Sequence, residues 1–160
     1  DNIDVKLVLI GGDGADSSVR RDLARQVDKL ELAEKVVFHG RVPYALLPTY
    51  YNDAKAVVLP SYYESFGLVT LEALACGTPV AATRVGIAAD VIVPGINGYL
   101  AEPGEPKSLV RAIISTLTLA AVRSPSGIRR TVTGYGWRNV ADKLEDVYCN
   151  NLNIFHIQTT

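Results

Sequence analysis

Residues 60–79 read PSYYESFGLVTLEALACGTP, and this stretch places two carboxylates, Glu64 and Glu72, on either side of a turn that leads into a helix. The apolar run at 56–60 predicts a strand that enters the stretch, and the run at 79–83 predicts a strand that leaves it. Parallel sheets bind ligands at the carboxyl ends of their strands. Both glutamates are therefore expected at a sheet edge where a ligand can bind.

A helix is predicted over residues 67–76, because leucines recur there at helical spacing and Gly77 then ends the helix. Glu64 precedes the first turn. The first backbone amides of a helix have no acceptor within it, and together with the positive end of the helix dipole they can bind a phosphate. Glu72 lies about 7.5 Å beyond Gly67 along the axis. The segment can hold an extended ligand with a diphosphate between two carboxylates, which is the shape of a nucleotide sugar.

Glu64, seven intervening residues and Glu72 resemble the signature of the retaining glycosyltransferases called group 1 or family 4. The resemblance extends over residues from about 5 to about 148. Five further segments follow the order and approximate spacing of that family: Leu7–Gly14, Val36–Val42, Asp53–Ser61, Pro94–Leu100 and Tyr135–Trp137. Members of the family have two Rossmann-like halves facing a cleft, an architecture called GT-B. The resemblance implies that this chain is most of the C-terminal, donor-binding half.

The resemblance also implies roles for individual residues. Glu64 would contact the transferred sugar and stabilise its developing positive charge, while Glu72 would bind the ribose hydroxyls. The matched donor-binding stretch, whose backbone amides would meet sugar and diphosphate, consists of Ser65, Phe66, Gly67, Leu68 and Val69. Arg41 and Val42 match a strand end near the base. The donor would be a nucleoside diphosphate sugar, with no metal and no other cofactor, so catalysis would be mainly electrostatic.

Each of these residues also has an ordinary structural explanation. Glu64 can be an acid that caps the following helix, and Glu72 can be a solvated residue on its outer face. Phe66 can be a core aromatic. These alternatives stay open at the level of sequence.

The chain departs from the family pattern at three positions after Gly86, where Ile87, Ala89 and Asp90 replace a glycine, a proline and a glutamate. The first strand and helix of the family's donor half, which supply an arginine and a lysine to the diphosphate, have no counterpart in residues 1–160, nor does the acceptor half. Lys55 and Arg84 are the two basic residues that can replace this arginine and lysine at the diphosphate. We therefore expect a partner domain that binds the acceptor, and an isolated segment that is inactive.

The composition is that of a globular protein, with 48% hydrophobic residues in 160, and this length favours a single domain. We assign residues 1–150 to the donor-binding domain and 151–160 to a tail. Lys and Arg number 16 against 17 for Asp and Glu, so no nucleic acid partner is expected. We expect no membrane span or signal peptide, although a missing part can make peripheral membrane contact. Cys76 and Cys149 fall on different predicted helices without metal-ligand spacing, which fits a reducing cytoplasm.

The order of elements predicts an α/β fold, a Rossmann-like three-layer domain with a parallel sheet. Because the strands are uniformly apolar, both faces of the sheet are expected to be buried. Residues 123–134 can be a loop or a short broken helix. The predicted strands lie at 5–11, 35–40, 56–60, 79–83 and 98–101, and the other predicted helices at about 17–30, 44–53, 86–93, 105–121 and 137–149.

The turn Gly11–Gly14 follows a strand and precedes a helix, as in dinucleotide-binding proteins, but the third glycine of that fingerprint is replaced by Ser17. We expect the glycines to allow a tight turn, with Ser17 or Ser18 capping the next helix. A nicotinamide-dependent enzyme, a sugar-nucleotide isomerase and a non-catalytic interaction domain remain alternative functions. His39 is expected in the core or at its rim, and Trp137 is expected to pack the last helix; His39 and His156 have no partner spacing typical of a metal site.

Overall fold

The computed structural model describes residues 5–12 and 17–157. The chain forms two compact units, which divide between Leu47 and Pro48. The length of the chain predicted a single domain. The division into two units follows the strand pairing. In the described residues, one sheet has two strands and the other has three, and no strand pairing joins the two sheets.

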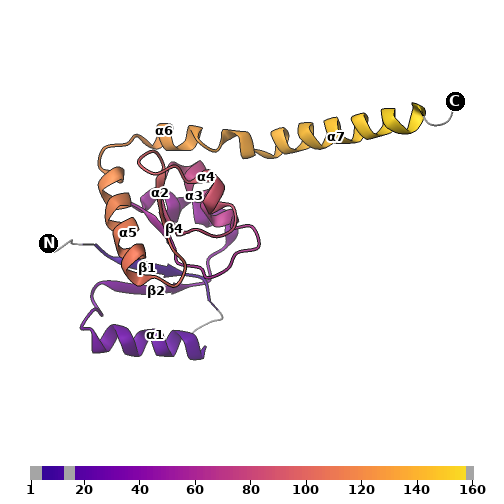
Figure 1. Cartoon of the computed structure of the whole chain (residues 1–160). Helices are drawn as coiled ribbons and strands as arrows, with labels where there is room; N and C mark the ends of the chain where they lie inside the picture. Colours follow the sequence, from indigo (N-terminus) through magenta and orange to yellow (C-terminus); the bar gives the residue numbers. More distant parts are fainter. Residues whose placement is uncertain (1–4, 13–16, 158–160) are drawn as a thin grey trace. The chain divides into compact units, whose positions relative to one another are not determined.

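The first unit is a strand, helix, strand arrangement (Figure 1). Strand β1 (Leu7–Ile10) pairs in parallel with β2 (Val36–Gly40), and α1 (Ser18–Lys29) connects them. The short 3-10 helix η1 (Tyr44–Leu46) follows β2. Parallel strands need such a crossover because their connection must return to the same end of the sheet.

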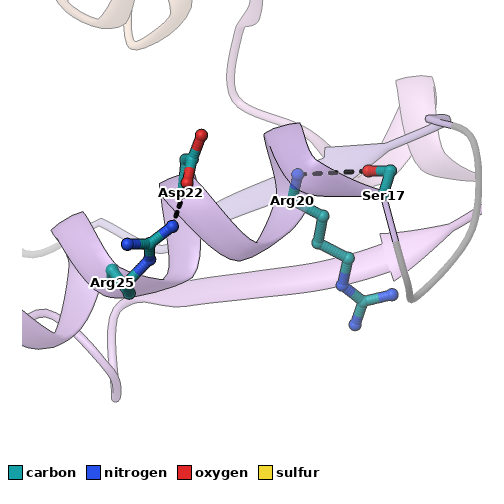
Figure 2. A network of polar contacts seen from close by, with 4 residues as sticks. All are labelled: Ser17, Arg20, Asp22 and Arg25. Atoms are coloured by element: carbon teal, nitrogen blue, oxygen red, sulfur yellow. Dashed lines mark hydrogen bonds and ion pairs between the residues drawn. The ribbon is translucent and has the colours of Figure 1, made fainter.

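Ser17 caps α1, as one of the two predicted capping residues (Figure 2). Its hydroxyl oxygen accepts a hydrogen bond from the backbone amide of Arg20 at 3.1 Å. Farther along the helix, Arg25 forms an ion pair with Asp22. The Arg20 guanidinium carbon lies 5.6 Å from the centre of the Phe38 ring, so a cation–π contact joins α1 to β2.

The expectation that both sheet faces are buried is wrong for the first unit. Leu7, Val8 and Val37 are exposed, and α1 has no buried residue. A sheet of two strands offers little area for packing, and one helix cannot cover both of its faces. Apolar sequence alone therefore does not fix burial in these strands.

The second unit contains the three-stranded parallel sheet, in the order β3, β4, β5. Its elements are α2 (Leu47–Asp53), β3 (Val57–Leu59), α3 (Leu68–Cys76), β4 (Val80–Thr83), α4 (Ala88–Val91), β5 (Gly98–Ala101), α5 (Pro106–Ala120), α6 (Pro125–Arg130), η2 (Thr133–Tyr135) and α7 (Trp137–Ile157). The predicted fold class is confirmed here: parallel strands alternate with helices that pack on them (Figure 1).

Strand β4 is the core of this unit, and all its residues are buried. Ala81 packs with Ala112 of α5, and the small side chains let strand and helix approach closely. Since side chains alternate across a strand, Val80 and Ala82 face the opposite side. Helix α3 contacts β4 as well and buries Ala73 and Leu74. Helices on two faces of one sheet make the three predicted layers.

A buried asparagine fixes the chain before β5. The side-chain nitrogen of Asn97 donates to the Val91 carbonyl and to the Thr131 hydroxyl, both at 2.9 Å. Its side-chain oxygen accepts from the Val93 amide at 2.8 Å. The side chain thereby joins the turn after α4 to the end of α6, which gives this residue a structural role.

The C-terminal helices differ most from the sequence prediction. Residues 123–134 contain α6 and the start of η2, so the helical alternative for this segment is confirmed. Helix α7 continues to Ile157, because no glycine or proline interrupts it. The packing expected of Trp137 is wrong, since its side chain is 85% exposed at the start of α7. Among the described residues, no helix has the length and apolarity needed to cross a bilayer.

We predict that Leu74→Ala lowers the free energy of unfolding by about 2–5 kcal/mol, because it leaves a cavity in the core. Leu68→Ala in the same helix is the matched control, since Leu68 is 55% exposed whereas Leu74 is 0% exposed. The control should change stability by only about 0.5 kcal/mol. Urea denaturation of both variants measures the difference, and equal losses would contradict the described core.

Candidate functional site

Glu64 lies in the loop between β3 and α3, at the carboxyl edge of the three-stranded sheet. Its side chain is half-buried, and its Oε1 accepts a hydrogen bond from the Ser61 hydroxyl at 2.8 Å. The Thr83 hydroxyl, at the end of β4, in turn donates to the Ser61 carbonyl at 2.6 Å. This relay of hydrogen bonds connects the carboxylate to the buried central strand.

Helix α3 begins at Leu68, and no side chain caps it. Its N-cap is Gly67, which adopts a left-handed conformation with φ of 90°. The capping alternative for Glu64 is therefore wrong, since the carboxylate binds Ser61 instead. An uncapped first turn leaves backbone amides that can bind an anion.

The loop after β4, which contains Gly86 and Ile87, holds the loop that carries Glu64. The Ile87 amide donates to the Phe66 carbonyl at 2.7 Å. A Cβ on Gly86 would lie 2.6 Å from the same carbonyl oxygen and 2.9 Å from the Glu64 Cβ. Only glycine fits this close approach. Ile87, one of the three departures from the family pattern, thus contributes its backbone to the position of the site.

Glu72 lies on α3 and is half-buried, so the alternative of a solvated outer residue is wrong. Its Oε2 accepts a hydrogen bond from the Tyr51 hydroxyl at 2.8 Å. Sequence reasoning missed Tyr51. A tyrosine in the helix before β3 is a visible signal, but periodicity does not identify its partner 21 residues later.

The remaining residues of the matched stretch line the surface before and at the start of α3. Phe66 is 46% exposed, which excludes a purely core role. Ser65, Leu68 and Val69 are also exposed, and Gly67 is half-buried. Glu64, this stretch and Glu72 therefore lie on one loop and the helix that follows it.

Arg41 and Val42 belong to the first unit. The Arg41 Nε donates to the Gly12 carbonyl at 3.1 Å, so it holds the turn after β1. Gly11 and Gly12 both have positive φ, as expected for a tight glycine turn, and Asp13 and Gly14 lie outside the described residues. A contribution of Arg41 and Val42 to a site with Glu64 and Glu72 stays a prediction.

The two candidate cations lie at opposite ends of the sheet. Arg84 follows β4 at the carboxyl edge, the same edge as Glu64, and pairs there with Glu102 at 3.2 Å. Lys55 precedes β3 at the amino edge. Arg84 is the better placed of the two for a ligand bound at α3.

Other polar candidates lie outside this site. His39 is exposed, at the rim rather than in the core, and the side chain of His156 lies outside the described residues. In the described part of the chain, no group of three or more His, Cys, Asp or Glu side chains could hold a metal ion. An open groove lined by Gly95, Tyr99, residues of α5 and residues of the turn after α5 contains none of the site residues.

Cys76 lies at the end of α3, one turn beyond Glu72. Burial raises the pKa of its thiol; the nearby Arg129 guanidinium lowers that pKa and the Glu72 carboxylate raises it further. Cys149 lies on α7 and is exposed, and both cysteines are free. The two thiols should therefore differ in reactivity.

The sequence of this segment matches known proteins over most of its length. Residues 1–125 match the family described as Glycosyl transferases group 1. The chain belongs to this family. D-inositol 3-phosphate glycosyltransferase from Xylanimonas cellulosilytica is 33% identical over 147 residues, which cover 91% of this chain and 35% of the relative. The chain thus spans about a third of the length of the curated relatives it matches.

Solved structures agree with the family. Sucrose-phosphate synthase from Thermosynechococcus elongatus is 34% identical with a TM-score of 0.79, and the match covers 93% of this chain and 39% of that one. Anabaena HepE, solved in complex with UDP, is 26% identical with a TM-score of 0.68 over 89% of this chain and 41% of its own. The expected resemblance to part of a GT-B glycosyltransferase is confirmed.

We predict that Gly86→Ala destabilises this glycosyltransferase domain more than Gly95→Ala. Both glycines have positive φ, so alanine is strained by about 1–2 kcal/mol at either position. Only at Gly86 does the added methyl overlap a backbone oxygen, which adds about 1–3 kcal/mol. Urea denaturation compares the two variants. Equal destabilisation would contradict the described packing of the two loops.

We also predict that iodoacetamide labels Cys76 more slowly than Cys149 at neutral pH, because the thiolate is the reactive form and burial raises the pKa of the Cys76 thiol. The difference should narrow as the pH rises through the elevated pKa of Cys76. Mass spectrometry of Cys76→Ser and Cys149→Ser follows each remaining thiol. Faster labelling of Cys76 would contradict its burial.

Proposed function

We propose that this chain is the donor-binding part of a retaining hexosyltransferase and that it binds a nucleoside diphosphate sugar at the start of α3. The observation that carries the proposal is the placement of Glu64 and Glu72 before and after an uncapped helix end, each held by a hydrogen bond. Such a helix end favours a diphosphate. The two carboxylates suit the hydroxyl-bearing groups on either side of it.

The relatives support a role in donor binding. They are named for different reactions, since one is a D-inositol 3-phosphate glycosyltransferase and another a sucrose-phosphate synthase. Both match nearly the whole of this segment, so the segment carries what these reactions share. HepE was solved with UDP and with UDP and glucose, which supports a nucleotide sugar as the shared substrate.

The proposal gives each carboxylate a separate task. Glu64 stabilises the positive charge that develops on the transferred sugar, and Glu72 binds the ribose. The backbone amides of the Ser65–Val69 stretch donate hydrogen bonds that stabilise the negative charge of the departing diphosphate. Arg41 and Val42 are assigned to the base of the nucleotide. Stabilisation by fixed dipoles needs no metal ion and no other cofactor. Arg84 is the cation proposed to assist at the diphosphate.

The remainder of the reaction is assigned to a longer parent protein. A separate acceptor-binding domain would hold the acceptor next to the donor, and without it the 160-residue segment should turn over little, because it loses the gain from proximity. A cytoplasmic location fits the two free cysteines and forms part of the proposal.

Calorimetric titration of the chain with UDP, ADP and GDP tests the donor site. At least one of these nucleotides should bind, weakly, since the acceptor half contributes nothing. A folded chain that binds none of them at millimolar concentration would contradict the proposal. NAD serves as a further ligand, because binding of NAD alone would favour the nicotinamide-dependent alternative.

The same titration should distinguish the roles of the two carboxylates. UDP lacks the transferred sugar, so Glu64→Gln should leave its affinity within about twofold, whereas Glu72→Gln should weaken it about tenfold through the lost charge at the ribose. Circular dichroism confirms that both variants fold. Equal effects of the two changes on UDP would contradict the separate roles.

A further inference from the structure

Tyr51 connects the helix before β3 to the carboxylate proposed to bind ribose. It lies on α2, its side chain is 9% exposed, and its hydroxyl donates to the Glu72 Oε2 at 2.8 Å. A phenol that donates to a carboxylate forms a charge-assisted bond, which is stronger than a bond between neutral groups. Glu72 is therefore held at a defined orientation by a nearly buried partner.

The backbone of the same tyrosine is fixed as well. The Thr78 hydroxyl donates to the Tyr51 carbonyl at 2.5 Å, and Thr78 is buried between α3 and β4. Both bonds join α2 to the α3–β4 segment. The tyrosine thus has a fixed position relative to the helix that carries Glu72.

We infer that Tyr51 is a positioning residue that orients Glu72 for recognition of the nucleoside. The inference rests on the proposed function, in which Glu72 binds the ribose hydroxyls. A free glutamate side chain samples several rotamers and loses that freedom when it binds a ligand. The bond from Tyr51 removes part of this cost before the ligand arrives, which is preorganisation.

This role differs measurably from a structural one. If the bond served only to join α2 to α3, its loss would lower stability and weaken all ligands of the site alike. If it orients Glu72, its loss should weaken ligands with a ribose and spare those without one. UDP and inorganic pyrophosphate are such a pair, because both carry the diphosphate and only UDP carries a ribose.

The test is calorimetric titration of the full 160-residue chain and its Tyr51→Phe variant with UDP and with inorganic pyrophosphate. The variant keeps the buried ring and removes only the hydroxyl. UDP affinity should fall about tenfold and pyrophosphate affinity should stay within about twofold. Tyr148→Phe on the exposed face of α7 is the matched control and should change neither affinity.

A double-mutant cycle shows whether Tyr51 acts through Glu72. In a Glu72→Ala background, Tyr51→Phe should change UDP affinity by less than about twofold, because the group it orients is gone. Thr78→Val provides a second variant that leaves the tyrosine intact but loosens its backbone, and it should also weaken UDP more than pyrophosphate. Thermal unfolding of each variant monitors the fold.

Three results would overturn the inference while the wild-type chain binds UDP: an unchanged UDP affinity in Tyr51→Phe, an equal loss for UDP and pyrophosphate, or a full effect that persists in the Glu72→Ala background. Failure of the wild-type chain to bind any of UDP, ADP and GDP would instead contradict the proposed function itself. The two failures are therefore distinguishable.

Discussion

Strand β4 pairs with β3 on one side and with β5 on the other, and its complete burial fixes the rest of the second unit. Parallel pairing aligns the carboxyl ends of the three strands at one edge. At that edge the Thr83 hydroxyl holds the Ser61 carbonyl, and Ser61 holds Glu64. The position of the proposed catalytic carboxylate thus follows from the core through hydrogen bonds of ordinary length.

The two carboxylates depend on different supports. Glu64 lies in a loop whose Phe66 carbonyl accepts a hydrogen bond from the Ile87 amide. Gly86 approaches the same carbonyl so closely that no larger residue fits. Glu72 lies on a regular helix, and a tyrosine from α2 orients it. In a group 1 glycosyltransferase this arrangement suits electrostatic catalysis, because groups that are already oriented need no reorganisation when charge develops. Rigid support of the site is therefore part of the proposed chemistry.

The sequence predicted the strands of both sheets, but it predicted their burial only in part. All five predicted strands occur, and Gly77 ends α3 with a φ of 88°, as expected for a glycine C-cap. Burial was predicted correctly for β4 and wrongly for β1, although both are apolar. The difference is the number of neighbours, since β4 has a paired strand on each side and β1 has only β2. The predicted packing of Trp137 was wrong for a related reason, because an apolar side chain is buried only if another element covers it.

The sequence by itself determined the order of elements, the ends of α3 and the spacing of Glu64 and Glu72, because backbone preferences and periodicity act over a few neighbouring residues. Only the tertiary structure decided which residue holds Glu72 and which backbone holds the loop of Glu64. Those contacts join residues far apart in the chain. They depend on how strands pair and helices pack, and no local pattern records that.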